Sequence, residues 1–400
     1  MGLLAKLKKR KREKDALEAT ERGGSLVKLG HYEEAVETYR QALEYAPDDN
    51  YILHRLGELY TQLRRFDEAI EIYNKALALT PNDGFALCEL GDIYLQLRRG
   101  EEAIPYLEQV LHANPDNTKA RHRLGNLFES LERFEEAMNQ YKVILDYQPN
   151  AAEVHYEMGL VLQRLERFSE AITSFRQAIR LKPEFPEAYY KLGVAYSRFG
   201  ETEDALDAYK QAIRLRPDYA EAHYNRGVVF QKAGRHREAA ESYRQALVVN
   251  SDYAEAHYNL GIALVKLGRL NEAASAFADC VRAKPTFAEA YYSLGTTYRQ
   301  LGHYVEAAEA YKRAIRTKVD FVQAHYKLGQ VFLLLADKRS ALSQYELLKT
   351  IDPPTAEKFF AGWFGFENIE RSVYDDKLFA SLEWHLTQCA SAVCMRLPLV

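Results

Sequence analysis

Cysteine is scarce in this chain: the 400 residues include four, at positions 88, 280, 389 and 394. Thiols this few and this scattered exclude a disulfide framework and favour a reducing compartment, so we expect a cytoplasmic protein. Long apolar runs are also lacking, because none approaches the roughly 18 residues that a membrane span needs. The basic first residues are not followed by the apolar stretch of a signal peptide. The composition therefore favours a soluble, folded chain.

The short motifs of common catalytic and cofactor-binding sites are missing as well. The sequence has no P-loop, no GxSxG, no HExxH and no dinucleotide-binding fingerprint. His385, Cys389 and Cys394 share one C-terminal segment, but no CxxC pair accompanies them. We therefore predict that the chain is not an enzyme, and that it has no catalytic residues, no cofactor and no metal site.

Net positive charge is lacking except at the start of the chain. The whole sequence has a net charge of −4, whereas residues 1–14 hold seven basic side chains and one acid. This segment is therefore +6 and the remainder −10, which excludes a nucleic-acid footprint over the whole chain. Three interpretations of the segment stay open: a solvated helix leading into the fold, weak attachment to an anionic membrane surface, or contact with nucleic acid, including nuclear import. The basic side chains concerned are Lys6, Lys8, Lys9, Arg10, Lys11 and Arg12.

A strict 34-residue repeat organises the rest of the chain. Twelve residues after each repeat glycine comes an alanine, and proline follows 24 residues after the glycine in most units. Apolar residues fall at helical spacing around both the glycine and the alanine, so each unit predicts two amphipathic helices ended by proline. A second glycine often stands where the first helix must reverse, which is typical of a left-handed C-cap. The repeat glycines are Gly23, Gly57, Gly91, Gly125, Gly159, Gly193, Gly227, Gly261, Gly295 and Gly329.

This order of Leu-Gly, aromatic, Ala, aromatic and Pro residues resembles the tetratricopeptide repeat (TPR) family over residues 16–355. The resemblance implies an all-α fold: a right-handed superhelical α-solenoid of ten helix pairs, whose first helices line the concave face. Because each pair buries its apolar faces only against its neighbours, such a stack needs a cap at its end. We therefore divide the chain into a basic N-terminal segment (1–15), ten repeats (16–355) and an aromatic-rich C-terminal cap or tail (356–400). The resemblance implies protein or peptide binding, and it does not imply catalysis.

Aromatic residues gather in the C-terminal segment: Phe359, Phe360, Trp363, Phe364 and Phe366. We expect a short helix that buries some of these rings on repeat ten. The polar outer surface that a cap requires is poorly represented here. Self-association or a partner contact through this aromatic cluster is therefore a second hypothesis.

The resemblance places three positions of each first helix, four residues apart, on the concave face. In repeats five to eight these positions hold a tyrosine, an aliphatic residue and a cation, and repeat nine continues the tyrosine column. Two asparagines also match the inner asparagine ladder of O-linked N-acetylglucosamine transferase. The predicted groove residues are Tyr156, Leu160, Arg164, Tyr190, Val194, Arg198, Tyr224, Asn225, Val228, Lys232, Tyr258, Asn259, Ile262, Lys266 and Tyr292.

Two interpretations of this pattern stay open. The residues are either the ones that TPR first helices commonly carry, or an exposed apolar strip flanked by residue types that dominate binding interfaces. The second interpretation predicts a non-enzymatic scaffold or adaptor that binds a peptide segment or partner protein with apolar anchors and acidic neighbours. The alternatives are a membrane-surface assembly factor tethered by the basic N-terminus, and an accessory subunit that recruits substrate for a separate enzyme such as a glycosyltransferase.

Overall fold

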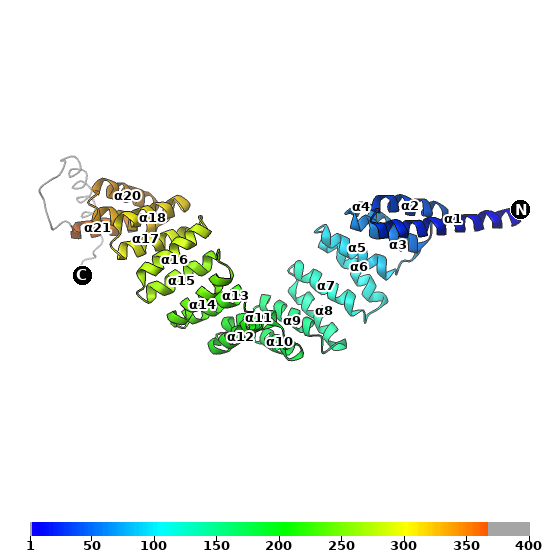
Figure 1. The fold of residues 1–400 in the computed structure, drawn as a ribbon, viewed down its shortest axis with the longest axis horizontal. Helices are drawn as coiled ribbons and strands as arrows, with labels where there is room; N and C mark the ends of the chain where they lie inside the picture. The colour runs from blue at the N-terminus through cyan, green and yellow to red at the C-terminus, as the bar shows by residue number, and fades with distance from the viewer. Residues whose placement is uncertain (1, 367–400) are drawn as a thin grey trace, which may run out of the picture. The chain divides into compact units, whose positions relative to one another are not determined.

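The computed structural model describes residues 2–366, with side chains from Lys9 to Trp363. Every regular element in this range is an α-helix, and no strand occurs in it (Figure 1). The helices belong to two compact units, Met1–Pro217 (unit 1) and Asp218–Val400 (unit 2), and each is described by itself. The predicted all-α fold is confirmed.

Unit 1 contains six helix pairs, and each helix packs against the next one along the chain. Its first helices are α1 (Gly2–Leu29), α3 (Asn50–Gln62), α5 (Gly84–Gln96), α7 (Thr118–Ser130), α9 (Ala152–Arg164) and α11 (Pro186–Phe199). Its second helices are α2 (Tyr32–Tyr45), α4 (Phe66–Leu79), α6 (Gly100–Ala113), α8 (Phe134–Tyr147), α10 (Phe168–Leu181) and α12 (Thr202–Leu215).

Unit 2 contains four helix pairs and one further helix within the described residues. Its first helices are α13 (Ala220–Lys232), α15 (Ala254–Lys266), α17 (Ala288–Gln300) and α19 (Val322–Leu334). Its second helices are α14 (His236–Val249), α16 (Leu270–Ala283), α18 (Tyr304–Thr317) and α20 (Lys338–Ile351). The last helix, α21 (Pro353–Phe366), packs against α19 and α20. The ten predicted helix pairs and the C-terminal helix are therefore present.

The alanine column marks where the two helices of a pair approach closely. All ten alanines, from Ala35 to Ala341 at intervals of 34, have no exposed surface. A larger side chain there would hold the helices apart, because a packed interior leaves no room for an added methylene. The sequence period is thus a period of helix contacts.

A residue in the left-handed backbone conformation follows each first helix. Glycine takes this conformation in five turns, with φ between 73° and 99°, as the sequence predicts. The other five turns use residues with a side chain, at φ of 57° or 58°, a conformation that costs them backbone strain. These five residues are Arg64, Arg98, Glu132, Glu166 and Ala336.

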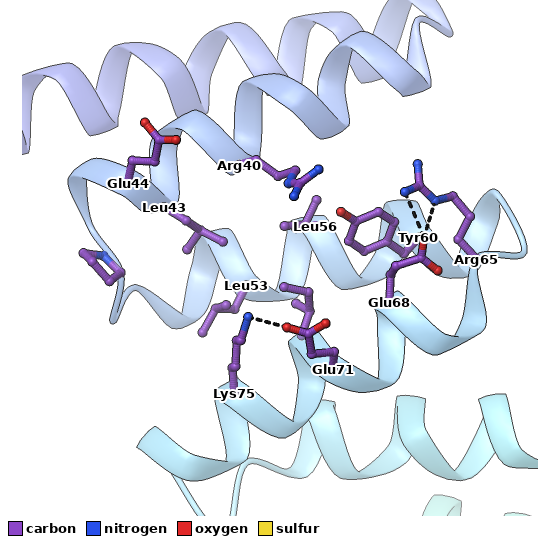
Figure 2. A pocket seen from close by; sticks show the side chains of 12 residues that line it. Arg40, Leu43, Glu44, Leu53, Leu56, Tyr60, Arg65, Glu68, Glu71 and Lys75 are labelled. Atoms are coloured by element: carbon purple, nitrogen blue, oxygen red, sulfur yellow. Dashed lines mark hydrogen bonds and ion pairs between the residues drawn. The ribbon is translucent and has the colours of Figure 1, made fainter.

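Ion pairs brace the turns between the helices of a pair. Arg65 Nε donates to Glu68 Oε1 at 2.9 Å (Figure 2). Arg65 Nη1 also lies 3.2 Å from Glu33 Oε2 of the preceding repeat. Arg133 repeats this arrangement, at 2.7 Å from Glu136. Each exposed pair contributes little free energy. Arg65 and Arg133 therefore already have counter-ions.

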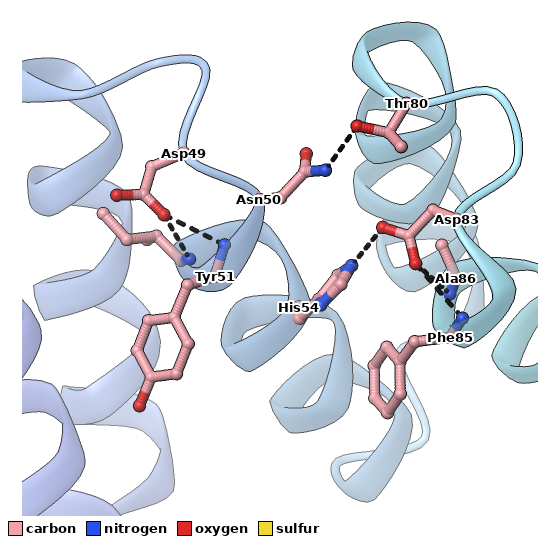
Figure 3. Close-up of polar contacts among 9 residues, drawn as sticks. Asp49, Asn50, Tyr51, His54, Thr80, Asp83, Phe85 and Ala86 are labelled. Carbon is pink, nitrogen blue, oxygen red and sulfur yellow. Dashed lines mark hydrogen bonds and ion pairs between the residues drawn. The ribbon is translucent and has the colours of Figure 1, made fainter.

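Polar contacts also join neighbouring repeats. The Asp49 carboxylate accepts hydrogen bonds from the backbone N–H groups of Tyr51 at 2.9 Å and Ile52 at 3.3 Å, which caps α3 (Figure 3). Asp83 caps α5 in the same way, and its second oxygen lies 2.6 Å from His54 Nε2 on α3. One carboxylate thus caps its own helix, α5, and also contacts α3, the first helix of the preceding repeat.

The aromatic side chains of α21 cover repeat ten. Phe359, Phe360 and Trp363 are buried, and the Phe359 ring centroid lies 5.8 Å from that of Tyr326 on α19. Phe360 stacks on Tyr345 of α20 at 5.1 Å. The expected short helix that buries aromatic rings on the last repeat is confirmed.

The predicted domain limits remain predictions. Helix α1 runs without a break from residue 2 through residue 15, and Ala16 is the first buried side chain described. The side chains of Phe364 and Phe366, and residues 367–400 with His385, Cys389 and Cys394, lie outside the described range.

Candidate partner-binding surface

The predicted groove residues lie on first helices of both units. In unit 1 they are on α9 and α11, and in unit 2 on α13, α15 and α17. The tyrosine, the aliphatic residue and the cation of one helix are four residues apart, so each trio forms a stripe along its helix. Their role in binding remains a prediction.

Each tyrosine of the stripe packs against other aromatic rings. The Tyr156 ring centroid is 5.8 Å from that of Phe175 and 4.9 Å from that of Phe185. Tyr258 in unit 2 has two such ring neighbours, Phe277 at 5.8 Å and Phe287 at 4.9 Å. Tilted ring pairs at these distances are favourable. The tyrosine column therefore stabilises helix stacking, and only part of each ring is left to contact a partner.

Asn259 is also engaged within the fold. Asn259 Nδ2 on α15 donates to the Tyr224 hydroxyl on α13 at 2.8 Å. Burial raises the pKa of this hydroxyl, so it stays protonated at neutral pH. The hydrogen bond joins consecutive first helices, which gives Asn259 a structural task.

The aliphatic side chains are less exposed than the apolar-strip interpretation requires. Leu160 and Val194 are half-buried in unit 1, as are Val228 and Ile262 in unit 2. Val228 and Ile262 pack against the buried core of their own unit. The apolar part of the surface is therefore a narrow line between tyrosines and cations.

The cations that end each stripe have no counter-ion. Arg164 and Arg198 in unit 1, and Lys232 and Lys266 in unit 2, are exposed. None of the four makes an ion pair or a side-chain hydrogen bond to any described residue. Arg167, which follows Arg164 by three residues and precedes α10, has its guanidinium 2.6 Å from the Glu170 carboxylate. The stripe cations are thus left available, whereas the nearby Arg167 is paired.

In unit 1 these cations surround a hollow of about 570 Å³ between α9 and α11. Its lining combines apolar side chains with three positive charges and two negative ones. The hollow is lined by Leu160, Val194, Arg164, Lys191, Arg198, Glu129, Glu166, Gln163 and Phe168.

Lys191 is the residue of this hollow that the sequence interpretation missed. Its side chain is half-buried, and burial, followed by repulsion from Arg164, lowers the pKa of its ammonium group. Its Nζ lies 5.5 Å from the centroid of the Tyr190 ring. Lys191 stands two residues before its repeat glycine, in the column of Asn225 and Asn259, so the column that carries the asparagine ladder also contains it.

The recurring histidines of the first helices brace the preceding turns. His155 Nε2 lies 2.9 Å from the carbonyl oxygen of Pro149, and His257 Nε2 lies 2.8 Å from that of Ser251. A carbonyl only accepts, so each Nε2 carries a proton and cannot bind a metal. Within the described part of the chain, no three His, Cys, Asp or Glu side chains gather as metal ligands. Cys280 is buried, and burial raises the pKa of its thiol to about 12.

The basic start of the chain is presented on helix α1. Lys9, Arg10, Lys11 and Arg12 are exposed, and the side chains of Lys6 and Lys8 lie outside the described range. No helix among the described residues has both the length and the apolar character needed to cross a membrane. The burial of Phe359, Phe360 and Trp363 covers the described rings of the aromatic cluster, so self-association through that cluster would depend on residues beyond Trp363.

Comparison with known families agrees with the helix pairs. Residues 85–290 match the family described as the cilia and flagella-associated protein 70 C-terminal domain, whose model is a TPR model and covers just over half of the chain. Residues 20–84 match the tetratricopeptide repeat model, and residues 295–335 a further TPR model. The chain belongs to the TPR family.

Similar TPR structures extend over parts of the chain. A C-terminal part of a TPR protein from Cytophaga hutchinsonii has 18% identity and a TM-score of 0.53, covering 60% of this chain and 99% of that one. MamA has 28% identity and a TM-score of 0.41, with 43% of this chain and 94% of MamA covered. YrrB, described as a TPR protein with an unusual peptide-binding site, has 24% identity and a TM-score of 0.42, with 46% and 95% covered. No curated protein matches the sequence.

Membership of this family defines the general class of function. TPR repeats are protein-interaction scaffolds and are typically non-catalytic. The TPR chain described here is therefore suited to protein–protein interaction in general.

Proposed function

We propose that this TPR chain is a non-enzymatic scaffold that binds an acidic, partly apolar segment of a partner protein. The contact surface in unit 1 is the hollow between α9 and α11. The same succession of tyrosine, aliphatic residue and cation gives unit 2 a second surface, on α13 and α15. The proposal also keeps a cytoplasmic location, in keeping with the free thiols of Cys88 and Cys280.

One observation carries this proposal: three cations line the hollow of unit 1, where they outnumber the two glutamates, and none of the three forms an ion pair with a described residue. Arg164 and Arg198 have no ion pair within the described residues, and the ammonium of Lys191 is half-buried beside Arg164. Like charges held together cost free energy unless an anion is bound between them. Arginine forks also match carboxylates in geometry. A partner that brings carboxylates, with an apolar side chain for Leu160 and Val194, fits this surface.

The test is selection of binding peptides from a random display library, with the full chain as bait. We expect the selected peptides to combine Asp or Glu with a large apolar residue. Their affinity should fall at least tenfold in the double variant Arg164→Glu/Arg198→Glu, and it should also fall as salt is raised. The matched control is Arg180→Glu/Arg214→Glu, which reverses two exposed arginines on the second helices α10 and α12. Peptides without an acidic bias, or equal losses in both double variants, would refute the proposal.

A further inference from the structure

A second type of hollow lies between neighbouring second helices. In unit 2, a groove of about 650 Å³ runs between α16 and α18 above α17. We call it the α16–α18 groove. Its apolar lining includes Ala278, Val281, Leu294, Tyr298, Val305 and Ala310.

The equivalent groove in unit 1, between α2 and α4 above α3, is polar. Arg40 extends into it at the position that Ala278 holds in unit 2 (Figure 2). The Lys75 ammonium and the Glu71 carboxylate, 2.7 Å apart, form its opposite side. The repeat therefore does not by itself make this groove apolar.

Two side chains distinguish the α16–α18 groove from the other repeats. Every other residue in the column of Ala278 is polar and larger than alanine: Arg40, Asn74, Glu108, Lys142, Arg176, Lys210, Arg244, Lys312 and Glu346. Every other residue in the column of Val305 is polar as well: Glu33, Asp67, Glu101, Glu135, Ser169, Glu203, Arg237, Asn271 and Arg339. Val305 is 66% exposed. Val305 is thus an exposed apolar residue at a position where the other nine repeats have a polar one. Such a residue indicates a surface that another molecule covers.

The charges beside the groove indicate what that molecule is like. The α18 side is lined by Glu306 and Glu309, which are exposed and form no ion pair with any described residue, and by the exposed Arg313. On the α16 side, Arg282 is paired with Asp279 at 2.8 Å. An apolar floor next to two free carboxylates fits an amphipathic helix with leucines on one face and basic residues beside them.

The chain itself contains such a helix. Residues 2–14 continue α1 beyond Ala16, its first buried residue, and residues 9–14 are exposed. This segment has seven basic residues and one acid, and helical spacing places Leu3, Leu4 and Leu7 on one face. We propose that residues 2–14 of one copy dock in the α16–α18 groove of a second copy.

The acidic residues on the first helices of repeats two and three are less suited than the α16–α18 groove to bind residues 2–14. Glu58 is already 2.7 Å from Arg55, and Asp92 is 3.1 Å from Arg123. Those carboxylates therefore already have counter-ions. The contact through the α16–α18 groove is heterologous, because the segment and the groove are different surfaces of the chain, so each copy can be donor and acceptor at once.

The test is sedimentation velocity of the full chain over a hundredfold range of concentration, at low and high salt. The average sedimentation coefficient should rise with concentration, and less so at high salt. The variant Ala278→Arg/Val305→Glu blocks the groove with residue types that other repeats carry, so it should remain folded. It should need at least tenfold higher concentration to associate. The control Gln245→Arg/Asn271→Glu introduces the same side chains on α14 and α16, outside the groove lining, and should associate like the wild type.

Complementation distinguishes this contact from other self-association. The variant Leu3→Glu/Leu7→Glu has a disabled segment and an intact groove, whereas Ala278→Arg/Val305→Glu has the reverse. Each alone should remain monomeric, and their mixture should form a one-to-one complex. A wild type that stays monomeric, association that the groove variant does not weaken, or a mixture that fails to form the complex would each overturn the proposal. So would binding of the segment to anionic vesicles or to RNA by a chain that remains monomeric.

Discussion

A Cβ atom on Gly159 would lie 2.5 Å from Cε1 of Phe175 on the second helix of the same repeat. Real Cβ atoms do not approach an aromatic carbon so closely, and the ring is fully buried, so it has nowhere to move. The repeat glycine therefore exists because the aromatic residue of α10 occupies the space that a side chain on α9 would need. The same contact, with Tyr or Phe, recurs at most repeat glycines.

Replacing Gly159 by alanine should therefore destabilise the chain, although alanine is the better helix former. We expect a loss of about 1–3 kcal/mol from overpacking. At Gly91 the nearest atom is a Leu107 carbon at 3.2 Å, so Gly91→Ala should be milder. A Cβ on Gly84 would meet nothing within 4 Å, and Gly84→Ala should be neutral or stabilising. Urea unfolding, with hydrogen exchange in α9 and α10, would show this order; equal effects at Gly159 and Gly84 would contradict it.

The strained turns predict a stabilising change. Arg98 holds a left-handed conformation at φ 58°, which costs a residue with a side chain about 1–2 kcal/mol. Glycine removes this strain but gives the unfolded chain more freedom, so Arg98→Gly should raise the free energy of unfolding by only about 0.5–1 kcal/mol. The reverse change, Gly268→Ala at φ 73°, should lower it by a similar amount. Thermal melts of the two variants should shift in opposite directions.

The helix pairs could be predicted from the sequence, whereas the binding surface could be predicted only in part. A contact such as that of Gly159 with Phe175 is made inside one repeat, so selection for it leaves a strict period in the sequence. The half-burial of Leu160 depends on how neighbouring helices pack, and no single column records it. Lys191 was missed because its column varies from repeat to repeat. Its proposed role depends on Arg164 and Arg198, which line the same hollow, and spacing alone does not show that these side chains come together.

The cap makes a prediction for the end of unit 2. Phe359 is 2% exposed, and its ring fills the space above Gly329, 2.6 Å from where a Cβ would lie. Phe359→Ala leaves a cavity between α21 and α19, with an expected loss of about 3–5 kcal/mol. Because repeats interact with their nearest neighbours, the effect should concentrate in α19 to α21. Hydrogen exchange should show fast exchange there, while Glu357→Ala, an exposed site on the same helix, changes nothing. Uniform loss of protection along unit 2 would argue against a local cap.

The half-buried acids of repeat three predict a dependence of stability on pH. Burial, followed by repulsion from Asp92, raises the pKa of Glu89 above its ordinary value. The folded chain therefore binds this proton more tightly than the unfolded chain does. As the pH rises above about 4.3, the ordinary pKa of a glutamate, the unfolded chain releases its proton first, and the contribution of Glu89 to the free energy of unfolding falls.

Glu89→Gln removes this titration while keeping the shape of the side chain. The variant should be more stable than the wild type at pH 7, and the difference should shrink as the pH is lowered toward 4. Urea unfolding at a series of pH values would measure this, with Glu108→Gln, an exposed site on α6, as the control that stays parallel to the wild type. A difference that is constant with pH would mean that Glu89 acts through packing and not through its charge. The raised pKa of Asp92 has burial as its first cause, opposed by Arg123 at 3.1 Å, so removing Arg123 should enlarge the same loss of stability at high pH.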